Sequence, residues 1–247
     1  MKIKIEDKGK GYSADLSKPL DISIPLHHGI ENPNAFWAPP VDFSAVRTDL
    51  FTGSVKEGGL VNFYNVRLNP HGNGTHTECV GHIAPELFSI NQSLQQFFAM
   101  AYLTSVYPAN IDGDRIIMKD QLSIPQNIDA EALIIRTFPN SPDKKTRNYS
   151  GTNPPYLYFE AAEYIKGLGI KHLLLDLPSV DREEDEGKLL AHKAFWDYPS
   201  APRMDATITE MAFIPDHIKD GLYLLELQVP AFELDAAPSR PVLYAIY

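Results

Sequence analysis

The chain has 247 residues, 44% hydrophobic and 22% charged, the composition of a soluble globular protein large enough to bury a sizeable core. Its formal net charge of −10 argues against a nucleic-acid partner, which requires a basic face, and no apolar run approaches the length of a membrane span. The single cysteine, Cys79, excludes an internal disulfide and favours a reducing compartment, so we expect a cytoplasmic protein.

The first half of the chain is divided into short segments. Residues 1–6 alternate charge with isoleucine and predict an edge strand rather than a signal peptide. Residues 60–68 alternate with a two-residue period, which predicts a strand that runs into a turn-rich corner at residues 69–74. Residues 93–100 are expected to form a helix with Ser93 as its N-cap.

The second half indicates an α/β protein. The apolar residues 132–137 predict a buried strand, and residues 159–168 have the spacing of a helix that Gly169 would end. The apolar run at residues 172–177 predicts a second covered strand, and strand, helix, glycine, strand is an α/β pattern. Without repeats or a low-complexity linker, we expect one domain over residues 1–247. Two further strands are predicted at residues 223–227 and 242–247.

Two charged segments are expected to be solvated loops. The densest basic cluster is Lys144, Lys145 and Arg147, in a segment rich in Pro, Asn and Ser. The acidic run at residues 181–186 is interpreted in the same way.

Chemistry-bearing residues gather at residues 71–82. His71, His76 and His82 lie here with Glu78 among them. His76 and Glu78 are two residues apart, so on an extended chain both side chains point to the same face. An imidazole and a carboxylate on one strand form half of a divalent-metal site. The alternative is a polar surface loop with incidental histidines.

A half-site needs ligands from elsewhere in the chain. His192, after the acidic run, and Glu210 are the candidates, although each taken alone is more often a surface residue. Cys79 alternates with His76 and Glu78, so we expect it to point away from them and to pack in the core.

The ordered landmarks resemble the cyclase-like family of metal-dependent hydrolases, which includes bacterial kynurenine formamidases and isatin hydrolases. That family carries His-x-Gly-Thr-His-x-Asp-x-Pro-x-His, and residues 72–82 read Gly-Asn-Gly-Thr-His-Thr-Glu-Cys-Val-Gly-His. Residues 21–23, 36–40, 169–181 and 221–247 extend the resemblance over nearly the whole chain. It implies a single α/β domain with a mixed central β-sheet flanked by helices, of the swivelling β/β/α type.

The resemblance also implies roles for individual residues. His76, Glu78, His192 and Glu210 would be the metal ligands, His82 the general base or proton shuttle, and the metal zinc or manganese. Asp176 and Asp181 are expected to fix the backbone around the site. Candidates to line a pocket for an aromatic substrate, with ordinary core packing as the alternative, are Trp37, Phe36 and Phe63.

The sequence departs from the family motif at its first histidine. Gly72 stands there and has no side chain to bind metal. His71, one residue earlier, would substitute only if the turn is rearranged, because a one-residue shift on an extended chain reverses the face. The missing histidine favours one metal ion over two. The motif aspartate is Glu78, which keeps the carboxylate but lengthens its reach.

The expected activity is hydrolysis of an amide, formamide or cyclic amide by a metal-activated water, as in the arylformamidases of tryptophan catabolism. One alternative is a metal-dependent dehydratase or lyase on the same scaffold, and another is a non-catalytic descendant that binds a small molecule. We expect a small-molecule substrate, and the resemblance implies a homodimer or homotetramer.

Overall fold

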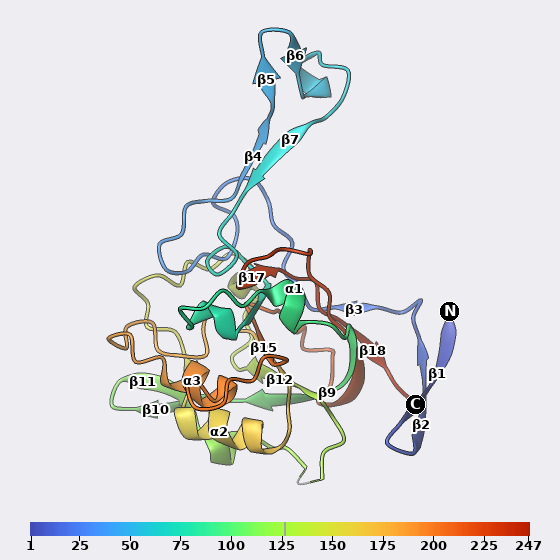
Figure 1. Cartoon of the computed structure of the whole chain (residues 1–247), viewed down its shortest axis with the longest axis vertical. Helices are drawn as coiled ribbons and strands as arrows, with labels where there is room; N and C mark the ends of the chain where they lie inside the picture. Colours follow the sequence, from blue (N-terminus) through green and yellow to red (C-terminus); the bar gives the residue numbers. More distant parts are fainter. Residues whose placement is uncertain (126) are drawn as a thin grey trace.

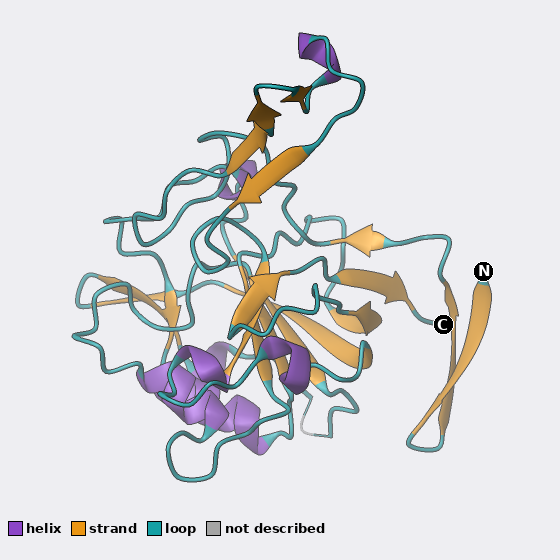
Figure 2. Ribbon diagram, turned by 45° about the horizontal axis from the view of Figure 1, so that its top comes forward, coloured by secondary structure: helices purple, strands orange, loops and turns teal. Residues whose placement is uncertain are grey.

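A nine-stranded mixed sheet forms the centre of the computed structural model, which describes residues 1–125 and 127–247 (Figures 1 and 2). Four neighbouring strands, β15, β14, β12 and β9, run parallel, and the other strands join antiparallel. The order across the sheet is β17 (Ala236–Pro238), β8 (His76–Cys79), β15 (Thr207–Glu210), β14 (His172–Leu175), β12 (Ala132–Thr137), β9 (Phe98–Val106), β16 (Gly221–Glu226), β18 (Val242–Ala245) and β3 (Leu20–Asp21).

Both faces of the parallel strands are covered. Leu133 and Ile135 of β12 pack on one side with α2 (Phe159–Gly167) and α3 (Leu190–Trp196). Ile134, one residue out of phase, packs on the other side with α1 (Ile90–Ser93). Burial on both faces explains the continuous apolar runs, and it confirms the strands predicted at residues 132–137 and 172–177.

Several other elements also agree with the sequence-based expectations. The helix predicted at residues 159–168 is α2, and Gly169 follows it with a φ of 80°, a left-handed conformation that suits glycine. β16 and β18 account for the two predicted C-terminal strands. The expected α/β class with a mixed central sheet is therefore confirmed.

Two ribbons project from the central sheet (Figure 1). β1 (Lys2–Asp7) pairs with β2 (Lys10–Asp15), which confirms the predicted N-terminal strand. The second ribbon, residues 42–67, is called the arm below. It contains β4 (Asp42–Ala45), β5 (Arg47–Thr48), β6 (Phe51–Thr52), the 3-10 helix η1 (Val55–Glu57) and β7 (Tyr64–Arg67), the part of the predicted residue 60–68 strand that forms.

The arm corrects the expectation for Phe63. This side chain is 59% exposed and meets Phe51 edge-on, with ring centroids 6.0 Å apart. It is therefore not a core residue, and its contact with a substrate stays a prediction. The remaining short elements are β10 (Ala109–Ile111), β11 (Asp114–Ile117), β13 (Tyr156–Leu157), η2 (Val80–His82), η3 (Lys119–Gln121) and η4 (Pro142–Lys145).

The helix predicted at residues 93–100 was wrong. The helix there is α1, whose N-cap is Ser89, and its Oγ accepts a hydrogen bond from the Gln92 amide at 3.2 Å. Residues from Phe98 onward form β9, which pairs with β12 on one edge and β16 on the other. Pairing on both edges outweighs the helical spacing of this short apolar segment.

The solvated-loop interpretation was wrong for Lys144. Its side chain is buried, and its Nζ lies 2.8 Å from Asp176 Oδ2 and donates to the Thr137 carbonyl. Asp176 also accepts the Thr137 backbone amide, as expected for a residue that fixes the backbone. A buried ammonium requires such a partner, because an unpaired charge inside a protein is strongly destabilising.

No helix in the described parts of the chain is long and apolar enough to cross a membrane.

His172 provides a pH-dependent component of stability. Its Nδ1 lies 2.9 Å from Thr207 Oγ1, and burial, with nearby Lys171, lowers its pKa from 6.5 to about 4. The unfolded chain binds this proton more readily, so stability present above pH 6.5 is lost as the pH falls toward 4. The loss amounts to about 3 kcal/mol.

We expect His172→Asn to remove this component while keeping a polar group near Thr207. Urea unfolding at pH 7, 5.5 and 4 measures the free energy of unfolding of both proteins. We expect this free energy to decline more steeply with acidification in the wild type than in the variant. Parallel declines in the two proteins would contradict the assignment.

Candidate metal centre

The register between β8 and β15 assembles the first part of the site. The strands are antiparallel, with His76 opposite Glu210 and Glu78 opposite Ile208. His76 Nε2 lies 3.4 Å from Glu210 Oε2. The side chains of His76, Glu78 and Glu210 are all buried. His76 and Glu78 reach the same cluster, as their two-residue spacing predicts.

The helix α3 supplies His192. Its Nε2 lies 3.2 Å from Glu78 Oε1 and 3.9 Å from Glu210 Oε1. On the other side of the ring, Nδ1 lies 2.6 Å from Asp181 Oδ2, and Asp181 Oδ1 accepts the Ala191 amide at 2.7 Å. Asp181 therefore fixes both the backbone and the imidazole, so it is not a solvated acidic residue.

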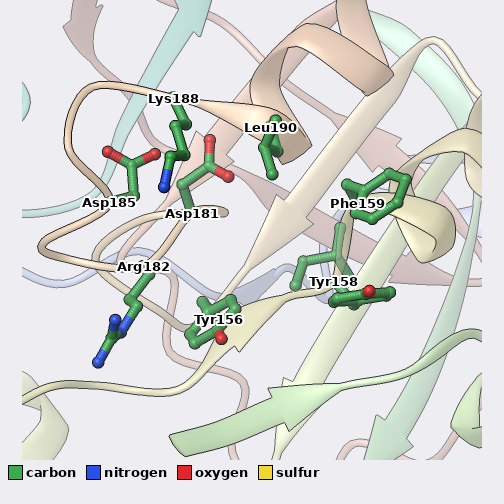
Figure 3. Close-up of a pocket in the computed structure, with 9 residues that line it drawn as sticks. Tyr156, Tyr158, Phe159, Asp181, Arg182, Asp185, Lys188 and Leu190 are labelled. Carbon is green, nitrogen blue, oxygen red and sulfur yellow. The ribbon is translucent and has the colours of Figure 1, made fainter.

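The four predicted ligands, His76, Glu78, His192 and Glu210, thus lie in one connected buried cluster. Their roles as ligands remain predictions. Asp181 and the residues Arg182, Asp185 and Lys188 that follow it border a cavity (Figure 3). The volume of this cavity is about 200 Å³.

His71 also reaches the cluster. Its Nδ1 lies 3.0 Å from Glu78 Oε2, because residues 69–74 form turns and the alternation rule for an extended chain does not apply. Gly72 could not simply become a histidine. A Cβ at this position would collide with the Ala38 Cβ and lie 2.9 Å from the Ala35 carbonyl oxygen. The local backbone therefore places an imidazole at position 71 and packs position 72 against residues 35–38.

The sequence-based interpretation missed Asp235. Its Oδ2 lies 2.8 Å from His71 Nε2 and 3.4 Å from His82 Nδ1. His71 and His82 stack with their ring centroids 4.2 Å apart. Asp235 reaches them because the Cys79 amide donates to its carbonyl just before β17, a three-residue strand without a recognisable sequence pattern.

The donor set fits a cation. Within the described part of the chain, the buried His76 Nε2 makes no hydrogen bond, although Glu210 Oε2 lies 3.4 Å away. The buried Glu78 Oε2 lies 3.0 Å from His71 Nδ1 but makes no hydrogen bond of good geometry. Such atoms are costly unless a ligand completes them. Three overlapping groups have ligand atoms within 4.8 Å of one another: His71, His76 and Glu78; His71, His82 and Asp235; and Glu78, His82 and His192. Imidazole and carboxylate donors together suit a divalent metal ion.

The electrostatics of the cluster favour positive charge. Burial alone would lower the pKa of His192, but Asp181 and Glu78 outweigh it and raise that pKa to about 10. Burial likewise opposes the rise of the His71 pKa to about 10, which Asp235 and Glu78 cause. Burial would raise the Glu78 pKa, but His82, His192 and His71 hold it well below its ordinary value. Hydrogen bonds from His71 and His82 also lower the Asp235 pKa.

The two aromatic candidates near the site have different environments. Trp37 is 67% exposed and borders a cavity of about 490 Å³ that also includes Asn34, Asn73 and Ser150. Phe36 lies at a smaller hollow with Tyr149 and Asp181. Their contact with a substrate stays a prediction. Cys79 is buried in the core opposite the ligands, as expected.

Comparison with known proteins gives a family and a fold. A cyclase family model, described as "Putative cyclase", matches residues 14–182. The kynurenine formamidase of Bacillus thuringiensis strain Al Hakam is 27% identical over 232 residues, which cover 93% of this chain and 99% of that protein.

Two solved structures share the fold. A predicted metal-dependent hydrolase from Bacillus stearothermophilus has a TM-score of 0.63 and 17% identity, covering 92% of this chain and 98% of its own. Isatin hydrolase A from Labrenzia aggregata has a TM-score of 0.65 and 12% identity, covering 92% and 93%.

We predict that His76→Ala and His192→Ala each weaken divalent-metal binding by at least ~100-fold, since loss of a residue that only supports a ligand already costs ~10- to 100-fold. Elemental analysis after dialysis against a metal buffer measures this. His172→Asn, at a buried histidine outside the cluster, is the matched control. Stoichiometric metal in both cluster variants would exclude the proposed ligands.

Proposed function

This chain belongs to the cyclase family, and on that premise we propose that it hydrolyses an amide, a formamide or a cyclic amide with a divalent metal ion and water. The observation that carries the proposal is the buried cluster of His76, Glu78, His192 and Glu210. Within the described residues, His76 Nε2 and Glu78 Oε2 make no hydrogen bond of good geometry there. The kynurenine formamidase relative supports the C–N bond as the target.

The metal is proposed to be zinc or manganese, held as one ion by His76, Glu78, His192 and Glu210. Such an ion supplies Lewis acidity, which lowers the pKa of water and polarises the substrate carbonyl. Asp181 holds the His192 ring so that Nε2 faces Glu78 and Glu210. An orienting partner of this kind also fixes the tautomer of a ligating histidine.

His82 is proposed to move the proton. It is partly exposed, so substrate and water can reach it, and its Nε2 lies 3.9 Å from Glu78 Oε2. Asp235 lies 3.4 Å from the opposite nitrogen, Nδ1, and favours the tautomer protonated there. Nε2 is then free to take a proton from water and return it to the leaving nitrogen. His71, stacked on His82 and sharing Asp235, helps to hold the ring in place.

We predict that His82→Ala lowers kcat by about 10²- to 10⁴-fold, the usual contribution of general acid–base catalysis, and leaves metal content unchanged. Asp235→Asn is expected to lower kcat less, because it removes only the orienting carboxylate. Steady-state kinetics of the metal-loaded enzyme test both, after a screen of aryl formamides, lactams and lactones. His217→Ala, at an exposed histidine, is the control.

The outcomes separate the candidate functions. Loss of metal in His82→Ala would make His82 a ligand. Product masses distinguish hydrolysis, which adds water, from the dehydratase alternative, which removes it. A folded protein without bound metal would favour the non-catalytic binder.

We also propose that the chain forms a homodimer, or a homotetramer built from it, through the arm. Every residue of β7 is exposed, and Leu50 and Leu60 are 98% and 97% exposed. A two-stranded ribbon is marginally stable in water, and such apolar patches mark interaction surfaces. In a two-fold symmetric dimer, the same surface of each copy contacts the other, so one interface would cover the arm of both copies. A second copy is therefore the simplest partner for the arm.

We expect the double variant Leu50→Asp, Leu60→Asp to shift the protein toward the monomer, because it places charges in the proposed interface. Light scattering coupled to gel filtration measures the mass. Leu87→Asp, at an exposed leucine outside the arm, should leave the mass unchanged. A monomeric wild type, or an oligomer that tolerates the arm substitutions, would contradict this assembly.

A further inference from the structure

A cavity of about 440 Å³ lies at the carboxyl ends of three parallel strands, β9, β12 and β14. In open α/β sheets, ligands bind at this edge, where loops leave the strands. The lining residues are Tyr107, Pro108, Asn110, Arg115, Thr137, Phe138, Pro139, Lys144, Arg147, Tyr149, Pro155 and Leu177.

This cavity is separate from the metal centre. None of the proposed ligands, nor His82 or Asp235, lines it among the described residues. Tyr149 forms part of its wall and packs against Met211, the residue after Glu210. The Tyr149–Met211 contact therefore lies between the cavity and the cluster.

The cavity has a local positive charge in a chain whose net charge is −10. Arg115, Lys144 and Arg147 line it, and no carboxylate does so in the described part of the chain. Lys144 is neutralised by Asp176, and Arg147 by Asp143, 2.7 Å away. Arg115 makes no ion pair within residues 1–125 and 127–247, and its one hydrogen bond goes to the Asn153 carbonyl.

One flat aromatic surface lies beside these cations. The rings of Tyr107 and Phe138 stack with centroids 5.2 Å apart, and the Arg136 guanidinium lies 5.3 Å from the Phe138 centroid, so the exposed ring of Tyr107 is the surface that remains for a ligand. The guanidinium of Arg147, which is paired with Asp143, lies 5.5 Å from the Tyr149 ring centroid. The cavity thus combines an unpaired guanidinium with apolar faces, which together match a ligand that carries a negative charge on one end of a planar ring.

We propose that this cavity binds a small aromatic carboxylate, with the carboxylate on Arg115 and the ring against Tyr107. The site is independent of the proposed hydrolase activity. A guanidinium binds a carboxylate through two parallel hydrogen bonds, which gives geometric selectivity as well as charge attraction.

Isothermal titration of the full-length, metal-loaded protein tests the proposal with three probes: benzoate, its neutral analogue benzamide, and inorganic phosphate. Benzoate should bind about 10-fold tighter than benzamide, which lacks the charge of the carboxylate. It should also bind about 10-fold tighter than phosphate, which lacks the ring. Arg115→Gln should weaken benzoate binding about 10-fold, and Tyr107→Ala should weaken it as well. Both side chains are exposed, so the variants should fold.

Arg240→Gln is the matched control, because Arg240 is an exposed arginine outside the arm that does not line the cavity. It makes the same change in net charge and should leave benzoate affinity unaltered. Equal losses in the Arg240 and Arg115 variants would reduce the effect to long-range charge and overturn the site. Unchanged affinity in Arg115→Gln would place benzoate elsewhere, the metal centre included, and would also overturn it. Equal binding of benzamide or phosphate would reject the aromatic carboxylate as the ligand class.

Discussion

Glu78 is the buried carboxylate on which the site depends. One oxygen lies 3.2 Å from His192, on a helix, and the other lies 3.0 Å from His71, in a turn, and 3.9 Å from His82. A carboxylate without water is stable only when surrounding groups neutralise it. The fold therefore brings three imidazoles to the same point. A divalent cation held there would neutralise Glu78 while its imidazole ligands are uncharged.

The backbone makes that convergence possible. The antiparallel pairing of β8 with β15 sets Glu210 opposite His76, and the pairing of β17 with β8 brings Asp235 beside them. The parallel strands behind these elements are covered on both faces, and β8 and β15, which carry three of the four proposed ligands, are each paired on both edges. The same sheet offers a second edge, at the ends of β9, β12 and β14, where a cationic cavity opens away from the metal centre.

Part of this arrangement could be predicted from the sequence because it follows from local rules. The two-residue spacing of His76 and Glu78 placed both on one face, and the apolar runs in β12 and β14 identified covered strands. The resemblance supplied His192 and Glu210, which no local pattern distinguished from surface residues.

Other features depend on tertiary contacts that the sequence does not display. His71 enters the cluster because the chain turns at residues 69–74, and the packing of position 72 against residues 35–38 excludes a side chain there. Asp235 depends on the pairing of a very short strand, and Lys144 on a buried partner 32 residues away. The first residues of β9 have the spacing of a helix, but their conformation is determined by pairing with β12 and β16 rather than by local propensity. The sequence pattern alone therefore predicted the wrong element.

The most direct test of the metal centre is an anomalous-difference map from crystals grown with zinc, recorded on both sides of the zinc absorption edge. We expect one strong peak within bonding distance of His76, Glu78, His192 and Glu210. A map without a peak at this cluster, or with its only strong peak elsewhere, would contradict it.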